Sequence, residues 1–425
     1  MHTLFLRMTG TPSALRRWLL CGAMLLSPWA QAGYFTWDMV ELPASSGASC
    51  GNGTPYRFFV NRTPLNHDVA ITFEGGGACW DQNACEGKGE YAASNPDGIP
   101  PDYMKSLKYM AARGLVTPFS SRLDPLQKVR TQDWSLVYLP YCTGDVHAGQ
   151  ALVVYADADP AHPRVQHHQG QVNIRAAMAW LRSHWGRPDN LLVGGFSAGG
   201  VGSTVNYQTV RQVLAPSGQS SLLADSGPLF SAPRGNTPQQ SPSLPLHERI
   251  RQAWGLDGPQ GLVTQLARKI PGLDTNNLGS LNAALARKYP QDRFGYLVFQ
   301  TDGTFSGFSY TDFFPDIANE PDPDVRAQKL NALWRTDLAN WLPLLDAAPN
   351  IDYHVPFYRD FNDSHCLTIV DFSGTGIQEQ GLTDISPFVD NLLDRGPTMR
   401  NVEADQVSDL TQWLSPILRL LNRIL

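Results

Sequence analysis

Charged residues are scarce in this sequence, and basic ones are fewer than acidic ones. They make up 17% of the 425 residues, with 33 Lys and Arg against 39 Asp and Glu. A basic surface of the kind that binds nucleic acid or anionic membranes is therefore not expected. Aromatic residues form 10% of the chain, which excludes a mainly disordered protein, because disordered chains are rich in charge and poor in aromatics. This composition is typical of an exported globular protein.

Long hydrophobic runs are missing after the first 32 residues, so we expect no integral membrane segment in the mature chain. The first 32 residues have the parts of a cleavable signal peptide. Three arginines are followed by a short apolar run and then by the small-residue site Ala30-Gln31-Ala32. We therefore expect residues 1–32 to be removed after Ala32 and the protein to be secreted or periplasmic.

Cysteine is sparse as well, with six in the whole chain and five after residue 32. No cluster of Cys and His has the short spacing of a zinc site, so we expect neither a metal nor another cofactor. Export permits disulfides. Cys79 and Cys85 bracket a short loop and are the first pair that we expect. Cys50 with Cys142 is the second choice, which leaves Cys366 unpaired.

Apolar runs that end at polar or glycine residues predict buried strands over 69–73, 135–141, 191–196, 221–224, 294–300 and 352–357. Helical periodicity predicts helices over 173–185, 200–214, 324–345 and 405–425. Strands that alternate with helices predict an α/β fold with a mostly parallel central sheet and helices on both faces. Neither a repeat nor a break in composition divides residues 33–425, so we expect a single domain with long loop insertions.

The strongest motif is Gly195-Phe196-Ser197-Ala198-Gly199, which matches G-x-S-x-G. It follows an apolar strand and precedes a helical pattern, as in a nucleophile elbow, where a sharp turn exposes the serine hydroxyl at the edge of the sheet. The helix N-terminus favours negative charge that develops there. Ser197 is therefore the predicted nucleophile. The alternative is an inert serine in a glycine-rich turn.

A second glycine-rich turn, Gly75-Gly76-Gly77-Ala78, follows the strand predicted over 69–73. Ester hydrolases need backbone N–H groups that stabilise an oxyanion, and a glycine run after an early strand supplies them. We expect Gly76 and Gly77, with Ala78 as a further candidate, to act together with Ala198. A phosphate-binding loop is the rival interpretation, but the Lys and the glycine spacing of such loops are missing.

The elbow predicts that an acid and then a histidine follow Ser197 along the chain. Asp302 ends a strong strand and is the predicted acid. Asp225 is the second choice, with a structural role at the elbow as its alternative. His365 lies on a polar loop after the last predicted strand, where a general base is expected. His354 lies within a strand and is expected to be structural.

These motifs together resemble the pectin acetylesterase family of Notum-like serine carboxylesterases, in the form of a bacterial member. The resemblance is carried by FEGGGACW-x-x-x-x-C, VYLPYCTGDVHAG, GGFSAGGVGS and ADSG, with Asp302 and His365 in the proper order. It implies an α/β-hydrolase-like fold and a serine carboxylesterase that removes short acyl groups, acetyl first among them, from a substrate such as pectin. It also implies Ser197, Asp302 and His365 as catalytic residues. Gly76, Gly77 and Ala198 match the oxyanion region, and the spacing of Cys79 and Cys85 looks like a disulfide beside it.

The chain departs from the plant members, which read GGGWC where this sequence has GGGACW. We expect Trp80 and Phe305 to contact the substrate. The stretch 227–246, rich in Pro, Ser, Gln and Gly, is expected to be a loop, either a lid or a surface insertion. An ester is the only expected partner, and a monomer is the expected state.

Two alternatives remain open. One is a lipase or polyester hydrolase with the same triad. The other is a catalytically inactive secreted protein that binds a polysaccharide or lipid through exposed aromatics, namely Trp80, Phe305, Phe308 and Tyr310.

Overall fold

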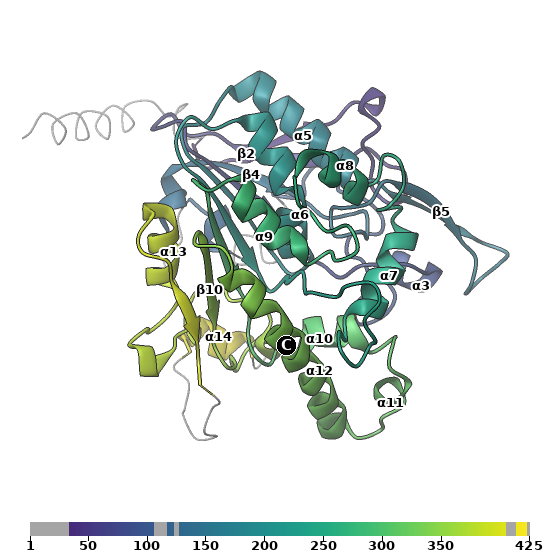
Figure 1. The fold of residues 1–425 in the computed structure, drawn as a ribbon. Helices are drawn as coiled ribbons and strands as arrows, with labels where there is room; N and C mark the ends of the chain where they lie inside the picture. The colour runs from purple at the N-terminus through teal and green to yellow at the C-terminus, as the bar shows by residue number, and fades with distance from the viewer. Residues whose placement is uncertain (1–33, 106–116, 123–126, 405–413, 423–425) are drawn as a thin grey trace, which may run out of the picture.

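A computed structural model describes residues 34–105, 117–122, 127–404 and 414–422 (Figure 1). The predicted signal peptide, residues 1–32, lies outside the described residues. So does most of the helix expected over 405–425, of which the structure describes α14 (Pro416–Leu421). Within the described residues, no helix is both long and apolar enough to cross a membrane.

The central element is a nine-stranded sheet, counted over the described residues, with the order β1-β2-β4-β3-β7-β8-β9-β10-β11. Within this order, the strands β4-β3-β7-β8-β9-β10-β11 are parallel to one another. At one edge, β2 pairs antiparallel with β4, and β1 pairs antiparallel with β2. The strands are β1 (Asp38–Glu41), β2 (Arg57–Asn61), β3 (Val69–Phe73), β4 (Ser135–Leu139), β7 (Leu191–Phe196), β8 (Ser220–Asp225), β9 (Arg293–Leu297), β10 (Ile351–Val355) and β11 (Arg400–Val402). All six predicted strands are present in this sheet, which confirms the predicted architecture.

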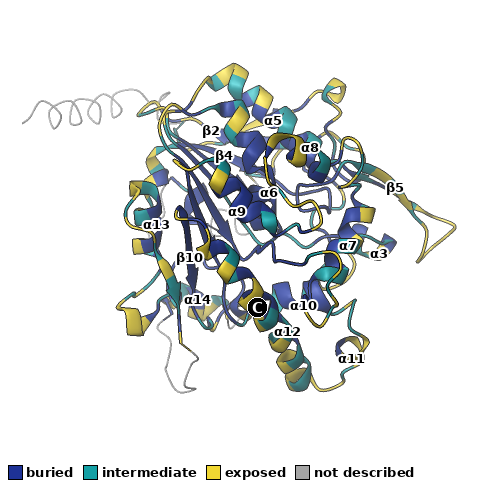
Figure 2. Ribbon diagram, viewed as in Figure 1, coloured by how far each residue is buried: buried dark blue, intermediate teal, exposed yellow. Residues whose placement is uncertain are grey.

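The strands that were not predicted lie at the margins. They are β1, β2 and β11 at the two ends of the sheet and a separate hairpin of β5 (Ala151–Tyr155) and β6 (Arg164–His168). The hairpin projects from the body of the protein, and much of its surface is exposed (Figure 2). The strands β1, β5, β6 and β11 are short or half-exposed, so they lack the continuous apolar run that marks a buried strand. The strand β2 is mostly buried, but its apolar run is only three residues long and is flanked by Arg57 and Asn61.

Helices cover both faces of the sheet, as expected. The longer ones are α5 (Gly170–Trp185), α6 (Ala198–Leu214) and α12 (Pro323–Asp346), all close to their predicted ranges. The others are α3 (Gln82–Cys85), α7 (Leu244–Ala253), α8 (Leu262–Lys269), α9 (Ser280–Lys288), α10 (Gly303–Tyr310), α11 (Pro315–Ala318) and α13 (Ser386–Asp394).

Each face of the sheet has its own apolar core, because neighbouring residues of a strand point to opposite faces. Val193 and Leu222 belong to the larger core, which also contains residues of α5, α6, α9 and α12. Leu192 and Leu223 belong to the smaller core, which contains residues of α13. Because the strands from β4 onward in the sheet are parallel, their carboxyl ends lie at the same edge, and the loops that follow β3, β7, β8, β9 and β10 meet there.

The stretch 227–246 is irregular until α7 begins at Leu244. It is only partly a surface feature, because Leu229 and Phe230 are buried. The ring of Phe230 packs edge-on against Trp334 and Trp341 of α12. The first part of this loop is thus fixed in the core.

Two disulfides join loops on the side of the sheet that carries β3 and β4. They link Cys79 to Cys85 and Cys50 to Cys142, as expected, and Cys366 is a buried free thiol. The second disulfide joins residues 92 positions apart, whereas the first spans only six.

We expect the Cys50→Ser/Cys142→Ser double variant to lose more stability than Cys79→Ser/Cys85→Ser. In the chain-entropy account, the disulfide that closes the long loop stabilises the protein by roughly 5 kcal/mol and the one that closes the short loop by roughly 2 kcal/mol. The difference arises because closing a longer loop removes more entropy from the unfolded chain. The two variants are matched, since all four cysteines are buried. Urea denaturation followed by circular dichroism measures the difference. Equal losses would contradict it.

Candidate active site

Ser197 forms the sharp turn between β7 and α6. Its φ of 57° and ψ of −127° are unusual for a non-glycine residue and mark a strained backbone. Its N–H donates to the Asp225 carbonyl at 2.9 Å, and its own carbonyl accepts from Gly200 N at 2.8 Å. A Cβ on Gly199 would lie 2.1 Å from the Phe73 carbonyl oxygen, so only glycine fits this position of the motif. The side chain of Ser197 is left half-exposed at the carboxyl edge of the sheet.

The glycine turn after β3 lies beside this elbow. Gly77 has a φ of 58°, a left-handed conformation that suits glycine. Within the described residues, no hydrogen bond engages the N–H groups of Gly76, Gly77 or Ala198. The N–H of Ala78 donates to the Tyr91 carbonyl at 3.1 Å, so Ala78 is not an available donor.

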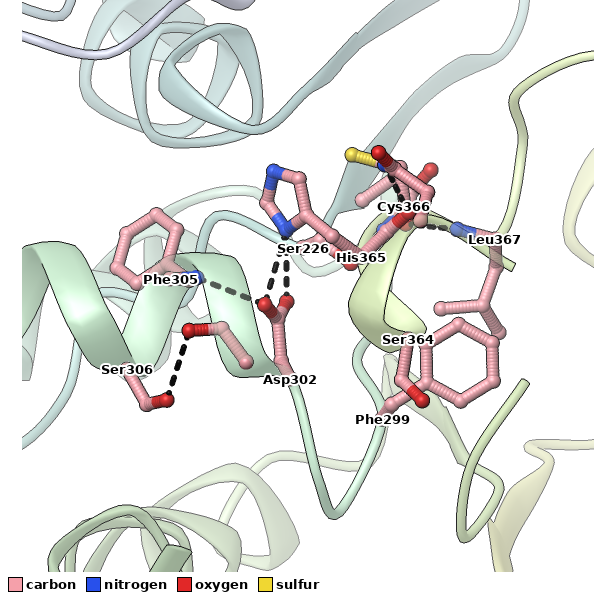
Figure 3. A network of polar contacts seen from close by, with 12 residues as sticks. Ser226, Phe299, Asp302, Phe305, Ser306, Ser364, His365, Cys366 and Leu367 are labelled. Atoms are coloured by element: carbon pink, nitrogen blue, oxygen red, sulfur yellow. Dashed lines mark hydrogen bonds and ion pairs between the residues drawn. The ribbon is translucent and has the colours of Figure 1, made fainter. Parts of the chain in front are cut away.

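His365 and Asp302 form a buried pair (Figure 3). His365 Nδ1 lies 3.0 Å and 2.9 Å from the two carboxylate oxygens of Asp302. Asp302 is fixed in turn, because it is the N-cap of α10 and accepts from Phe305 N at 2.8 Å. Since a carboxylate accepts, Nδ1 carries a proton, and a neutral His365 has its lone pair on Nε2.

His365 Nε2 is the free atom of this pair. It is buried and has no hydrogen-bond partner among the described residues, so Ser197 Oγ and His365 Nε2 are not hydrogen-bonded. Catalytic hydrogen bonds are often long in the absence of substrate. Burial by itself lowers the pKa of His365, but the charge and hydrogen bond of Asp302 and the charges of Asp225 and Asp363 outweigh it. The pKa of His365 is therefore raised above its usual value of 6.5.

Asp225, the second choice for the acid, forms no hydrogen bond with the His365 ring. Its buried carboxylate accepts from Leu367 N at 2.8 Å, Thr368 N at 2.7 Å and Thr368 Oγ1 at 2.6 Å. Its backbone carbonyl accepts from Ser197 N. Asp225 thus ties the segment after His365 to the elbow, which matches the structural role considered for it.

A cavity of about 390 Å³ opens beside Ser197 and is called the Ser197 cavity below. Its lining includes Gly77, Ala198, Val146 and the aromatic rings of Tyr91, Phe305 and Phe308. No residue of the stretch 227–246, which the structure describes in full, lines this cavity. The loop therefore does not act as a lid in this conformation.

The two residues expected to contact substrate differ in position. Phe305 lines the Ser197 cavity, but Trp80 does not. The Trp80 ring packs against Phe308 at 5.5 Å and Phe313 at 5.8 Å between centroids, so it supports the cavity wall from behind. Tyr310 is fully buried and Phe305 nearly so. The patch of exposed aromatics that a non-catalytic binding protein would use is therefore not formed by these residues.

Comparison with known proteins identifies the family of this chain. A sequence model of the family described as Pectinacetylesterase matches residues 30–244, half of the chain. The chain belongs to the pectin acetylesterase family. The family indicates an enzyme that hydrolyses ester bonds and takes an ester as its substrate.

Curated relatives of this pectin acetylesterase family member include two carboxylesterases. Palmitoleoyl-protein carboxylesterase notum1a of Danio rerio is 25% identical over 194 residues, which cover 43% of this chain and 34% of the relative. Palmitoleoyl-protein carboxylesterase NOTUM of Schmidtea mediterranea is 21% identical over 183 residues, covering 43% and 32%. The aligned part of the chain spans about a third of the length of these relatives.

Solved structures agree on the fold. Two crystal forms of the Wnt deacylase Notum from Drosophila superpose with TM-scores of 0.54 and 0.53 at 15% and 17% identity. They cover 87% and 88% of this chain, and 97% and 96% of the Drosophila chains. At this identity the likeness establishes the α/β-hydrolase-like fold alone.

His147 is a residue of the site region that sequence reasoning missed. Its Nε2–H donates to the Glu74 carbonyl at 2.9 Å, directly before the glycine turn. Burial lowers the pKa of His147 to about 4, so the ring is neutral at ordinary pH. The carboxylate of Glu74 accepts from Tyr103 OH at 2.8 Å and from Tyr141 N at 2.8 Å. The glycine turn is thus anchored through both the backbone and the side chain of Glu74. The only signal in the sequence was the family motif over 137–149.

One group of side chains in the described part of the chain has the proximity of a metal site. Ligand atoms of Cys79, Cys85 and His168 lie within 4.8 Å of one another. However, both sulfurs are bonded to each other, and the ring of His168 contacts Tyr155 OH at 3.0 Å and the Thr143 carbonyl at 3.1 Å. With the disulfide formed, no thiolate is left to bind an ion.

We expect nuclear magnetic resonance titration of the imidazole to give His365 a pKa above 6.5. Asp302→Asn should lower this pKa markedly, because it removes both the charge and the hydrogen-bond acceptor at Nδ1, after which burial favours the neutral ring. Asp363→Asn is the control. It removes a nearby negative charge that is not bonded to the ring and should lower the pKa less. An equal effect of the two variants would contradict this assignment.

Proposed function

We propose that this protein is a secreted serine carboxylesterase that removes short acyl groups, acetyl above all, from a polysaccharide such as pectin. The observation that carries the proposal is the buried Asp302–His365 pair, whose free Nε2 accompanies a strained serine at a strand-to-helix turn. Secretion is supported by two disulfides, which form in oxidising compartments.

In the acylation step, His365 Nε2 takes the proton of the Ser197 hydroxyl as Oγ bonds to the ester carbonyl carbon. The carbonyl oxygen becomes an oxyanion, and the unengaged N–H groups of Gly76, Gly77 and Ala198 donate to it. When the intermediate collapses, the bond to the alcohol oxygen breaks, and His365 returns the proton to that oxygen. The products are an acyl-serine and a free alcohol.

In the deacylation step, water replaces the alcohol. His365 takes a proton from the water molecule while the water oxygen bonds to the acyl carbon, and the oxyanion forms again in the same place. The bond to Ser197 Oγ then breaks, and Oγ recovers the proton from His365. Asp302 holds the ring in the required tautomer and stabilises its positive charge in both steps.

The apolar lining of the Ser197 cavity supports the proposal that the acyl group is small and apolar. Phe305 and Phe308 are contributed by α10, the helix that Asp302 caps, so the same element holds the acid and the cavity wall. We assign Phe305 to substrate contact and Trp80 to support of Phe308. An acetyl group buries little area, so most of the binding energy would come from the alcohol part of the ester.

Ser197→Ala should abolish hydrolysis of p-nitrophenyl acetate and release of acetate from acetylated pectin. The expected loss in kcat is roughly 10⁶-fold, because the covalent step has no other nucleophile. Ser183→Ala, which alters an exposed serine on α5, is the control and should retain full activity. Mass spectrometry of the wild type after rapid acid quench should detect one acetyl group on Ser197. Full activity in Ser197→Ala would refute the proposal.

The pH dependence of kcat/KM for p-nitrophenyl acetate should show an acidic limb above pH 6.5. The base must be neutral, and a raised pKa keeps His365 protonated to higher pH than an unperturbed histidine. Activity is therefore lost as the pH falls through the raised pKa. In Asp363→Asn the limb should move to slightly lower pH, since one negative charge near the ring is removed. A limb at or below pH 6.5 in the wild type would count against His365 as the base.

A further inference from the structure

Val146 contributes to the lining of two cavities. It lines the Ser197 cavity and also a second cavity of about 480 Å³, called the inner cavity below. The inner cavity lies between α6, α7, α8 and the segment 273–281, and its lining is mostly aliphatic, with Val205, Leu229, Ile250 and Val263 among its residues. One residue thus contributes to the lining of both cavities.

The backbone at Val146 is held in a conformation that disfavours valine. Its φ is 46°, and that of the next residue, His147, is 60°. A β-branched residue in this region is a genuine outlier that costs of order 1–3 kcal/mol. The conformation is fixed on both sides, because Val146 N donates to Tyr141 OH at 2.8 Å and the His147 ring is bonded to the Glu74 carbonyl. Val146 as a whole is only 5% exposed.

The polar residues in the lining of the inner cavity lie at one end, where Asp274 and Thr275 are exposed and Asn277 is buried. Asn277 accepts from Ala232 N at 3.1 Å and donates to Ser231 Oγ at 3.0 Å. Asp274 accepts from Asn276 N at 2.9 Å. Since the buried Asn277 has partners and the remaining wall is mainly aliphatic, the cavity suits a hydrocarbon chain better than a sugar or an ion.

We propose that Val146 is the specificity residue that limits the length of the acyl group, because its side chain separates the Ser197 cavity from the inner cavity. The inference rests on the proposed esterase function. An acetyl or butyryl group ends before the Val146 side chain, whereas a longer chain meets it. Removal of that side chain joins the two cavities and gives a medium-length acyl chain an apolar path. Each additional methylene group that is buried there should raise kcat/KM roughly fourfold.

The test uses Val146→Gly in the full chain and a series of p-nitrophenyl esters from acetate to decanoate. Glycine suits a φ of 46°, so the variant is expected to fold. The wild type should lose activity steeply beyond butyrate. Val146→Gly should raise kcat/KM for octanoate relative to acetate by roughly 100-fold, at about fourfold for each of several methylenes.

A second substitution supplies the matched control. Val263→Phe on α8 fills the inner cavity from its far side and lies outside the Ser197 cavity. Alone it should leave the wild-type ester profile unchanged, and in Val146→Gly it should cancel the gain for octanoate. A Val146→Gly enzyme that hydrolyses acetate but keeps the wild-type chain-length profile would overturn the inference. So would a wild type that prefers decanoate.

A binding measurement separates failure of this inference from failure of the proposed function. Calorimetric titration with decanoate should show tighter binding to Ser197→Ala/Val146→Gly than to Ser197→Ala, and Val263→Phe should reverse the gain. If no variant hydrolyses any ester but decanoate binding responds in this way, the proposed function fails and the partition at Val146 stands. If decanoate binding does not respond, the partition is refuted, whatever the activity.

Discussion

The geometry of this protein depends on the strained turn at Ser197. A non-glycine residue at φ 57° is unfavourable by about 1–3 kcal/mol, so surrounding contacts must hold it. Asp225 restrains this turn, because its backbone carbonyl accepts a hydrogen bond from Ser197 N. Its carboxylate accepts hydrogen bonds from the backbone N–H groups of Leu367 and Thr368. One residue at the end of β8 therefore positions both the serine and the loop that carries His365. The bare G-x-S-x-G motif contains no hint of this link.

The electrostatics of the site follow from the same arrangement. Burial alone would lower the pKa of His365, but Asp302, Asp225 and Asp363 surround the ring with negative charge and raise it. Burial raises the pKa of Asp225 itself, whereas its three hydrogen bonds lower it, so the backbone contacts that fix the loop also help to keep this carboxylate charged. Stability of the loop and basicity of the histidine are thus coupled through one buried group.

Strain recurs around the site. Val146 and His147 adopt left-handed conformations beneath the glycine turn, and so do Asp363 and Cys366 on either side of His365. Buried hydrogen bonds hold both segments, from Tyr141 OH and His147 on one side and from Ser226 Oγ, which accepts from Cys366 N, on the other (Figure 3). Such conformations persist only where the surrounding structure over-determines them. Among these residues, Val146 lines the Ser197 cavity, whereas Asp363 and Cys366 flank the candidate base His365.

The sequence by itself determined six of the nine strands of the described central sheet and the α/β order, because apolar runs and glycine turns are local signals. The Cys79–Cys85 disulfide closes a short loop and was equally local, whereas Cys50–Cys142 was only the second choice, because its cysteines lie 92 positions apart. The sequence also singled out Ser197, Asp302 and His365 as candidates, since their order along the chain is a property of the motif. Only the tertiary structure decided that Asp302 rather than Asp225 meets the imidazole, that Trp80 lies behind Phe308, and that His147 and Val146 underlie the glycine turn. These outcomes depend on which loops meet at the carboxyl edge of the sheet. They join residues far apart in the chain, such as Asp302 and His365, which are 63 positions apart, and no local pattern records such contacts.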